Sequence, residues 1–137
     1  MKVQKGILLV LLSIIAFTAK SQHLVGKTKD QVVQEMKTSL PDYVIDNTSV
    51  NHTYKYLKYV NKVTEQTLLV FLSETDVCTS TKLMSDYSNL LQVKKDLNAQ
   101  FKPAGKDTWK YIVGGVRYTV KLKREEWYFT VFTSKDK

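Results

Sequence analysis

The stretch "TWKYIVGGVRYTVKL" (Thr108–Leu122) decides the fold, because it reads as two β-strands joined by a two-residue turn. Two adjacent glycines, Gly114 and Gly115, supply the positive φ angles that such a turn requires. Side chains alternate along a strand, so the turn also predicts which residues share a face. The expected cross-strand pairs on the apolar face are Val113 with Val116, Tyr111 with Tyr118, and Trp109 with Val120.

The following stretch, "LKREEWYFTVFTSK" (Leu122–Lys135), predicts a third strand of the same sheet. An even-length connection, either Arg124-Glu125 or Lys123 to Glu126, keeps the alternation intact. The expected pairs are then Leu122 with Trp127, Val120 with Phe129, and Tyr118 with Val131.

Glu125 and Glu126 are interpreted as part of this turn and not as a catalytic carboxylate pair. A catalytic pair needs two acids near one reacting atom, with surroundings that drive their pKa values apart. Neighbouring acids in an exposed turn receive little desolvation, and Lys123 and Arg124 lie next to them in the sequence. No catalytic residue is therefore predicted here.

The second face of this sheet is the candidate binding surface, because it mixes cationic and aromatic side chains. Such a mixture can hold an anionic glycan or an acidic protein surface. The alternative is that the helices of the protein cover this side. The candidate residues are Lys110, Ile112, Arg117, Lys121, Lys123, Tyr128 and Phe132.

Two helices are expected upstream. Thr28 and Gln31 form a capping box, and Pro41 ends the run of apolar residues that follows. Ser85 or Asp86 is expected to cap the second helix, which ends near the Lys102–Gly105 turn. The apolar face of the first helix is expected to contain Val32, Val33, Met36 and Leu40. That of the second is expected to contain Tyr87, Leu90, Leu91, Leu97 and Phe101.

Three further strands are expected at Thr53–Val60, Thr67–Leu72 and Val77–Met84, which are rich in aromatic and aliphatic strand formers. The sequence therefore predicts an α+β fold in the order αβββαβββ, with an antiparallel sheet packed with two α-helices. The repeated pattern of "TYKYL" at Thr53 and "TWKYI" at Thr108 also suggests a duplicated αβββ unit.

The N-terminus reads as a secretory signal peptide, residues 1–21. Lys2 and Lys5 precede an apolar run, Ile7 to Phe17, and Ala19 and Ser21 suit a cleavage site before Gln22. The run is shorter than the roughly 20 residues that span a membrane. The alternative is an uncleaved anchor. Residues 22–137 are then expected to form one domain in the periplasm or outside the cell.

Charge and cysteine usage exclude several classes of function. Loss of residues 1–21 would lower the formal net charge from +8 to +5, because three lysines are removed. The basic residues are lysines except for Arg117 and Arg124, whereas readers of nucleic acid rely on arginine for base contacts. Cys78 is the only cysteine, so no internal disulfide is expected, and a buried thiol is favoured over a link between chains.

No cofactor or metal site is predicted. His23 and His52 lie far apart in the sequence and neither belongs to a metal-binding motif. The "GKT" at Gly26 to Thr28 lacks the upstream glycine of a phosphate-binding loop. The two glycines of the hairpin lead into a strand and not into a helix.

Several segments resemble small uncharacterised exported proteins of Bacteroidota-type bacteria. These segments are "LVGKTKDQVVQEM" near the start, "VCTSTKLMSDYSNL" in the middle and "LKREEWYFTVFT" at the end. That resemblance implies no assigned activity. In architecture alone, the paired helix-and-sheet units resemble the β-lactamase-inhibitory protein and outer-membrane assembly lipoprotein modules, which are interaction domains. Lipidation is not expected, because no cysteine follows the apolar run.

The sequence thus favours a non-catalytic binding module over an enzyme. Its expected partner is an envelope protein or an anionic glycan, and its oligomeric state stays open. Two alternatives remain at this point. One is an inhibitor of another protein, and the other is a small hydrolase whose site is assembled across the fold.

Overall fold

A computed structural model describes residues 23–47 and 55–137 of the chain. These residues form an eight-stranded antiparallel sheet with two α-helices, which confirms the predicted α+β class. The predicted signal peptide, Gln22 and His52 lie outside the described residues. The helical elements are α2 (Lys29–Ser39), the 3₁₀-helix η1 (Tyr87–Asn89) and α3 (Leu90–Gln100).

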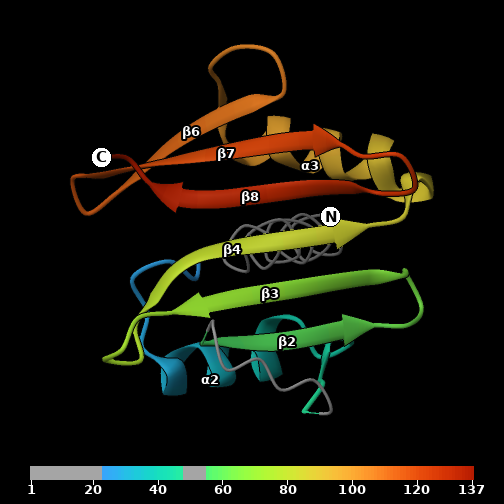
Figure 1. The fold of residues 1–137 in the computed structure, drawn as a ribbon. Helices are drawn as coiled ribbons and strands as arrows, with labels where there is room; N and C mark the ends of the chain where they lie inside the picture. The colour runs from blue at the N-terminus through green and yellow to red at the C-terminus, as the bar shows by residue number, and fades with distance from the viewer. Residues whose placement is uncertain (1–22, 48–54) are drawn as a thin grey trace, which may run out of the picture.

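The strands follow the order β1-β2-β3-β4-β8-β7-β6-β5 across the sheet, and each strand is antiparallel to its neighbours (Figure 1). The order therefore differs from the expected αβββαβββ, because each half contains an additional short strand, β1 or β5, at the edge of the sheet. Two residues are too few to give a strand pattern in the sequence. The strands are β1 (Val44–Ile45), β2 (Tyr56–Asn61), β3 (Gln66–Leu72), β4 (Cys78–Ser85), β5 (Lys102–Pro103), β6 (Thr108–Val113), β7 (Val116–Arg124) and β8 (Phe129–Lys135).

The β6–β7 hairpin has the predicted register. Gly114 and Gly115 form its turn with φ angles of 56° and 77°, values that residues with a Cβ rarely adopt. The observed pairs are Val113 with Val116, Tyr111 with Tyr118, and Trp109 with Val120.

The predicted β7–β8 register was wrong by four residues, because β7 continues through Arg124. Leu122 pairs with Val131, and residues 125–128 form the connection. Within it the backbone N–H of Glu125 donates to the Tyr128 carbonyl at 2.8 Å. Since the error is an even number, Phe129 and Val131 remain on the core face. Trp127 does not, and its side chain is 79% exposed.

The first helix matches its prediction closely. Thr28 accepts from the backbone N–H of Gln31, whose side chain accepts from the backbone N–H of Thr28, so the capping box is present. Val32 and Met36 are fully buried.

The second helix differs from its predicted apolar face at one residue. Asp86 caps the short helix η1 by accepting from the backbone N–H of Ser88, and α3 begins only at Leu90. Helical spacing then turns Leu97 into the core and Leu91 away from it. Leu91 is 84% exposed, so its predicted core position was wrong.

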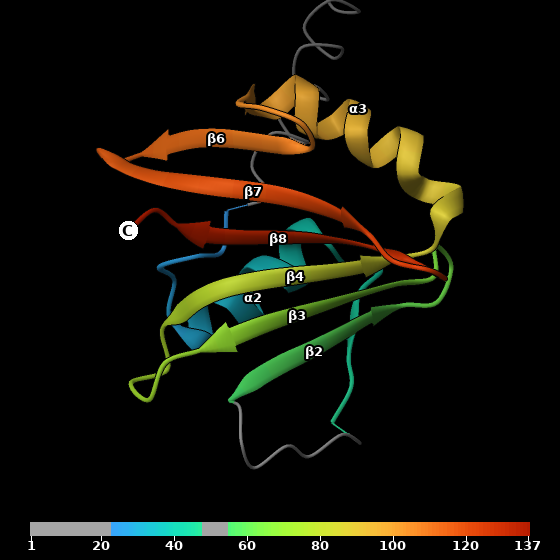
Figure 2. The same cartoon turned by 45° about the horizontal axis from the view of Figure 1, so that its top comes forward.

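The apolar core consists of two clusters on one side of the sheet. Figures 1 and 2 show α2 beside β2–β4 and α3 beside β6–β8, both on this side. Trp109 links α3 to the sheet, because its Nε1 donates to Asn98 Oδ1 at 2.8 Å. One cluster contains Leu24, Val25, Val32, Met36, Leu57, Tyr59, Val70, Leu72, Cys78 and Tyr118, and the other contains Leu97, Trp109, Val120, Leu122, Phe129 and Val131.

Residues 23–28 bind the start of α2 to the sheet. The backbone N–H of Gly26 donates to the Cys78 carbonyl, and that of Cys78 donates to the Lys27 carbonyl, both at 2.8 Å. His23 lies edge-on to Tyr118, with ring centres 4.8 Å apart. Its Nδ1 is 3.0 Å from the hydroxyl oxygen of Tyr111.

Within the described part of the chain, Cys78 is a free, buried thiol, as predicted. Burial raises the pKa of this thiol to about 11, so it is protonated at neutral pH and a poor nucleophile.

A disulfide-exchange reagent at pH 8 should therefore label the native protein far more slowly than the denatured protein. Complete labelling of the native protein within the mixing time would contradict this burial.

Stability should fall as the pH is lowered below the ordinary histidine pKa of about 6.5. Burial, and then the nearby Lys27, lower the pKa of His23 in the folded state. The unfolded chain therefore binds a proton at His23 more readily, and the folded state loses stability as the pH falls towards the lower value.

Urea unfolding of the wild type and His23→Asn, at pH 7.5 and pH 5.5, isolates this contribution from that of the carboxylates. The stability advantage of the wild type should be smaller at pH 5.5. An advantage that grows at pH 5.5 would show that His23 gains a proton on folding.

Candidate binding face

The side of the sheet opposite the two core clusters is not covered by a described helix. Six of the seven predicted site residues lie on this side by strand alternation and register. Tyr128, the seventh, lies in the 125–128 connection ahead of β8, so strand alternation does not assign it to a side. The predicted residues that share this side are Lys110, Ile112, Arg117, Lys121, Lys123 and Phe132.

The first half of the sheet extends this surface with residues that the sequence pattern did not reveal. They point to the same side because β4 pairs with β8, and segments about 50 residues apart carry no local signal of such pairing. These residues are Tyr56, Lys58, Leu69, Phe71, Lys82 and Met84. We call the two sets together the open face.

A cation–aromatic–cation row crosses the middle of the open face. Lys82 of β4 is the cross-strand partner of Phe132 of β8, which is in turn the partner of Lys121 of β7. Neighbouring strands lie about 4.8 Å apart, so the three side chains are adjacent. Phe132 is 39% exposed, which leaves part of its ring accessible between two lysines.

Acidic residues at the rim neutralise other lysines of the open face. Lys110 pairs with Asp136 at 3.3 Å, Lys58 with Asp46 at 3.3 Å, and Lys123 with Glu125 at 3.4 Å. By contrast, Lys82 and Lys121 form no ion pair with any residue that the structure describes.

Asp136 also anchors the C-terminal end of the chain to β7. Thr119 donates to its carboxylate, and its backbone N–H donates to the Arg117 carbonyl at 2.9 Å. The hydrogen bond from Thr119 and the ion pair with Lys110 lower the pKa of Asp136. Because its carboxylate is ionised and already committed to Lys110, Lys110 is less available to a partner than Lys121.

A cleft of about 460 Å³ lies beside β5 and β6, at the edge of the open face. Three of the predicted residues, Lys110, Ile112 and Arg117, line it. Lys102 adds a further cation, since it is the cross-strand partner of Lys110. Ile112 is 63% exposed and gives the cleft an apolar wall. The remaining lining residues are Gln100, Phe101 and Tyr111.

The described residues give little support to other chemistry. Across residues 23–47 and 55–137, no three His, Cys, Asp or Glu side chains are grouped as a metal site would require. Glu125 and Glu126 lie in the connection between β7 and β8, as predicted. None of the helices in the described part of the chain has the length and apolar character needed to cross a membrane.

Comparison with known proteins adds no assignment. No protein-family model, no curated protein and no solved structure matches the chain significantly.

Proposed function

We propose that this protein is an exported, non-catalytic binding module whose open face holds an anionic partner. The partner is an envelope protein with an acidic surface or an anionic glycan. The observation that carries this proposal is the Lys82–Phe132–Lys121 row, which combines an accessible aromatic ring with two cations that form no ion pair with a described residue. Its expected location is the periplasm or the exterior of the cell, which rests on the signal pattern of residues 1–21.

The arrangement of the row suits recognition of a carboxylate- or sulfate-bearing surface. Unpaired surface lysines attract an anion without first breaking an ion pair, whereas Lys110 and Lys123 would have to exchange their acidic partners. The ring of Phe132 offers apolar contact area between the charges. Attraction between exposed charges is screened beyond about 8 Å at physiological salt, so binding should be salt-sensitive.

The strand order supports the proposed duplication, now as an αββββ unit. Each half contributes one helix and four strands, and the order runs inwards from β1 to β4 and from β5 to β8. The last strands of the two halves, β4 and β8, meet at the centre. The Lys82–Phe132–Lys121 row spans this junction, so the proposed binding surface needs both halves.

Inhibition of another protein is a second candidate, favoured by one observation. Trp127 is 79% exposed in a connection that is held by hydrogen bonds, including one from the Tyr87 hydroxyl to the Glu125 carbonyl. An exposed tryptophan on a constrained loop is a typical anchor for a pocket on a partner.

Reversal of the charges of Lys82 and Lys121 should weaken binding to an anionic glycan. We expect Lys82→Glu/Lys121→Glu to lower the affinity for heparin, a sulfated glycan, by about tenfold or more at low salt, because two attractions become repulsions. Affinity can be measured by calorimetry at two salt concentrations. This variant avoids Lys110, whose reversal would place a carboxylate beside Asp136 and disturb the end of β7.

Lys37→Glu/Lys95→Glu is the matched control, since both lysines are exposed on helices and the net charge changes equally. The control should retain most of the affinity, and thermal unfolding should show that both variants fold. An equal loss of affinity in the two variants would mean that binding depends only on net charge, and this would contradict a site on the open face.

A further inference from the structure

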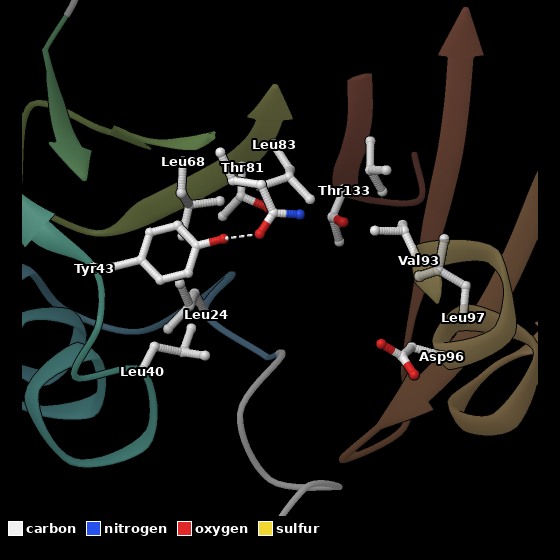
Figure 3. A pocket seen from close by; sticks show the side chains of 12 residues that line it. Leu24, Leu40, Tyr43, Leu68, Thr81, Leu83, Val93, Asp96, Leu97 and Thr133 are labelled. Carbon is white, nitrogen blue, oxygen red and sulfur yellow. Dashed lines mark hydrogen bonds between the residues drawn. The ribbon is translucent and has the colours of Figure 1, made fainter. Parts of the chain in front are cut away.

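A second cavity lies on the other side of the sheet, between the two helices. Its volume is about 240 Å³. Figure 3 shows Leu40 on one side of it and Val93 and Leu97 of α3 on the other, with Leu68 and Leu83 of the sheet between them. Three more apolar or aromatic residues, Leu24, Tyr43 and Val131, complete the walls.

Two threonines form a polar spot in these apolar walls. Thr81 of β4 and Thr133 of β8 are cross-strand partners at the centre of the sheet, and both line the cavity (Figure 3). Neither hydroxyl forms a hydrogen bond with another described residue. Hydroxyls that have no protein partner are available to a ligand, so this pair is suited to one that can donate or accept a hydrogen bond.

Gln66 adds an oriented donor to the same wall. Its Oε1 accepts from the hydroxyls of Tyr43 and Thr64, both at 2.9 Å, which fixes the direction of the amide. Its Nε2 donates to Ser85 Oγ at 3.2 Å. An amide nitrogen has two N–H groups, and the second has no partner among the described residues.

The charge of the lining limits the ligand class. Among the described residues that line the cavity, Asp96 is the only charged one, and it is an acid. With no cation among these described lining residues, a carboxylate or phosphate would have to lose its hydration without an opposite charge to replace it. The lining thus favours a neutral group.

The volume limits the ligand size. An engineered apolar cavity of about 150 Å³ accommodates benzene, so a cavity of about 240 Å³ has room for roughly nine or ten non-hydrogen atoms. From the apolar walls, the uncommitted hydroxyls and the lack of cations among the described lining residues, we propose that this cavity binds a small neutral amphiphile with one hydroxyl or carbonyl group. The polar group would meet Thr81, Thr133 and Gln66, and the chain would contact the leucines.

The probe for this proposal is 1-octanol, compared with octanoate, which has a similar chain but is anionic. Titration into the exported form of the protein, followed by NMR, should give saturable shifts at residues that line the cavity. Octanoate should bind at least about tenfold more weakly. Octanoate binding that equals or exceeds octanol binding would overturn the assignment of a neutral ligand, and so would the absence of saturable shifts with octanol.

Variants then locate the site. Val93→Phe should abolish octanol binding by filling the cavity from α3, whereas Leu91→Phe, on the exposed side of the same helix, should not change it. Thr81→Val/Thr133→Val should weaken binding by about threefold to tenfold, the value of one net hydrogen bond. If the double variant fails to fold, Thr133→Val alone tests one of the two hydroxyls. Unchanged binding in Val93→Phe would contradict the proposed cavity.

Discussion

The pairing of β4 with β8 is the interaction on which the rest of the structure depends. Each half of the chain would otherwise end in an unpaired strand edge, β4 or β8, and such an edge promotes aggregation. The pairing places Ser85 opposite Phe129, and both are almost completely buried. It also joins Leu83 of β4 to Val131 of β8, in the middle of the core side. The β4–β8 pairing therefore produces one continuous sheet whose two sides differ in composition.

The two sides of this sheet have different physical characters. On the core side, α2 and α3 belong to separate apolar clusters, and the cavity lies between them. The open face instead carries lysines and aromatic residues, and rim acids neutralise part of its charge. Binding at the open face should depend on salt, whereas binding in the cavity should depend on shape and apolar contact. The two proposed sites can therefore be tested independently.

The sequence predicted those features that depend on neighbouring residues. The glycine turn fixed the β6–β7 register, and the capping box fixed the start of α2. The β7–β8 register differs from the predicted one because Lys123 and Arg124 extend β7. No residue pattern in "KREE" indicates this extension. The extra 3₁₀ turn ahead of α3 likewise moved Leu91 out of the core. Six of the seven predicted site residues share a face, but Lys82 was missed because its neighbour Phe132 lies in the other half of the chain.

We propose that the β4–β8 junction creates one binding row from residues of both halves. The most direct measurement is an NMR titration of the protein with a heparin-derived hexasaccharide, which maps the contact residue by residue. The account predicts that the largest amide shifts occur together at Lys82, Lys121 and Phe132, on three adjacent strands. Shifts confined to α2 and α3, with the row unchanged at saturation, would contradict it.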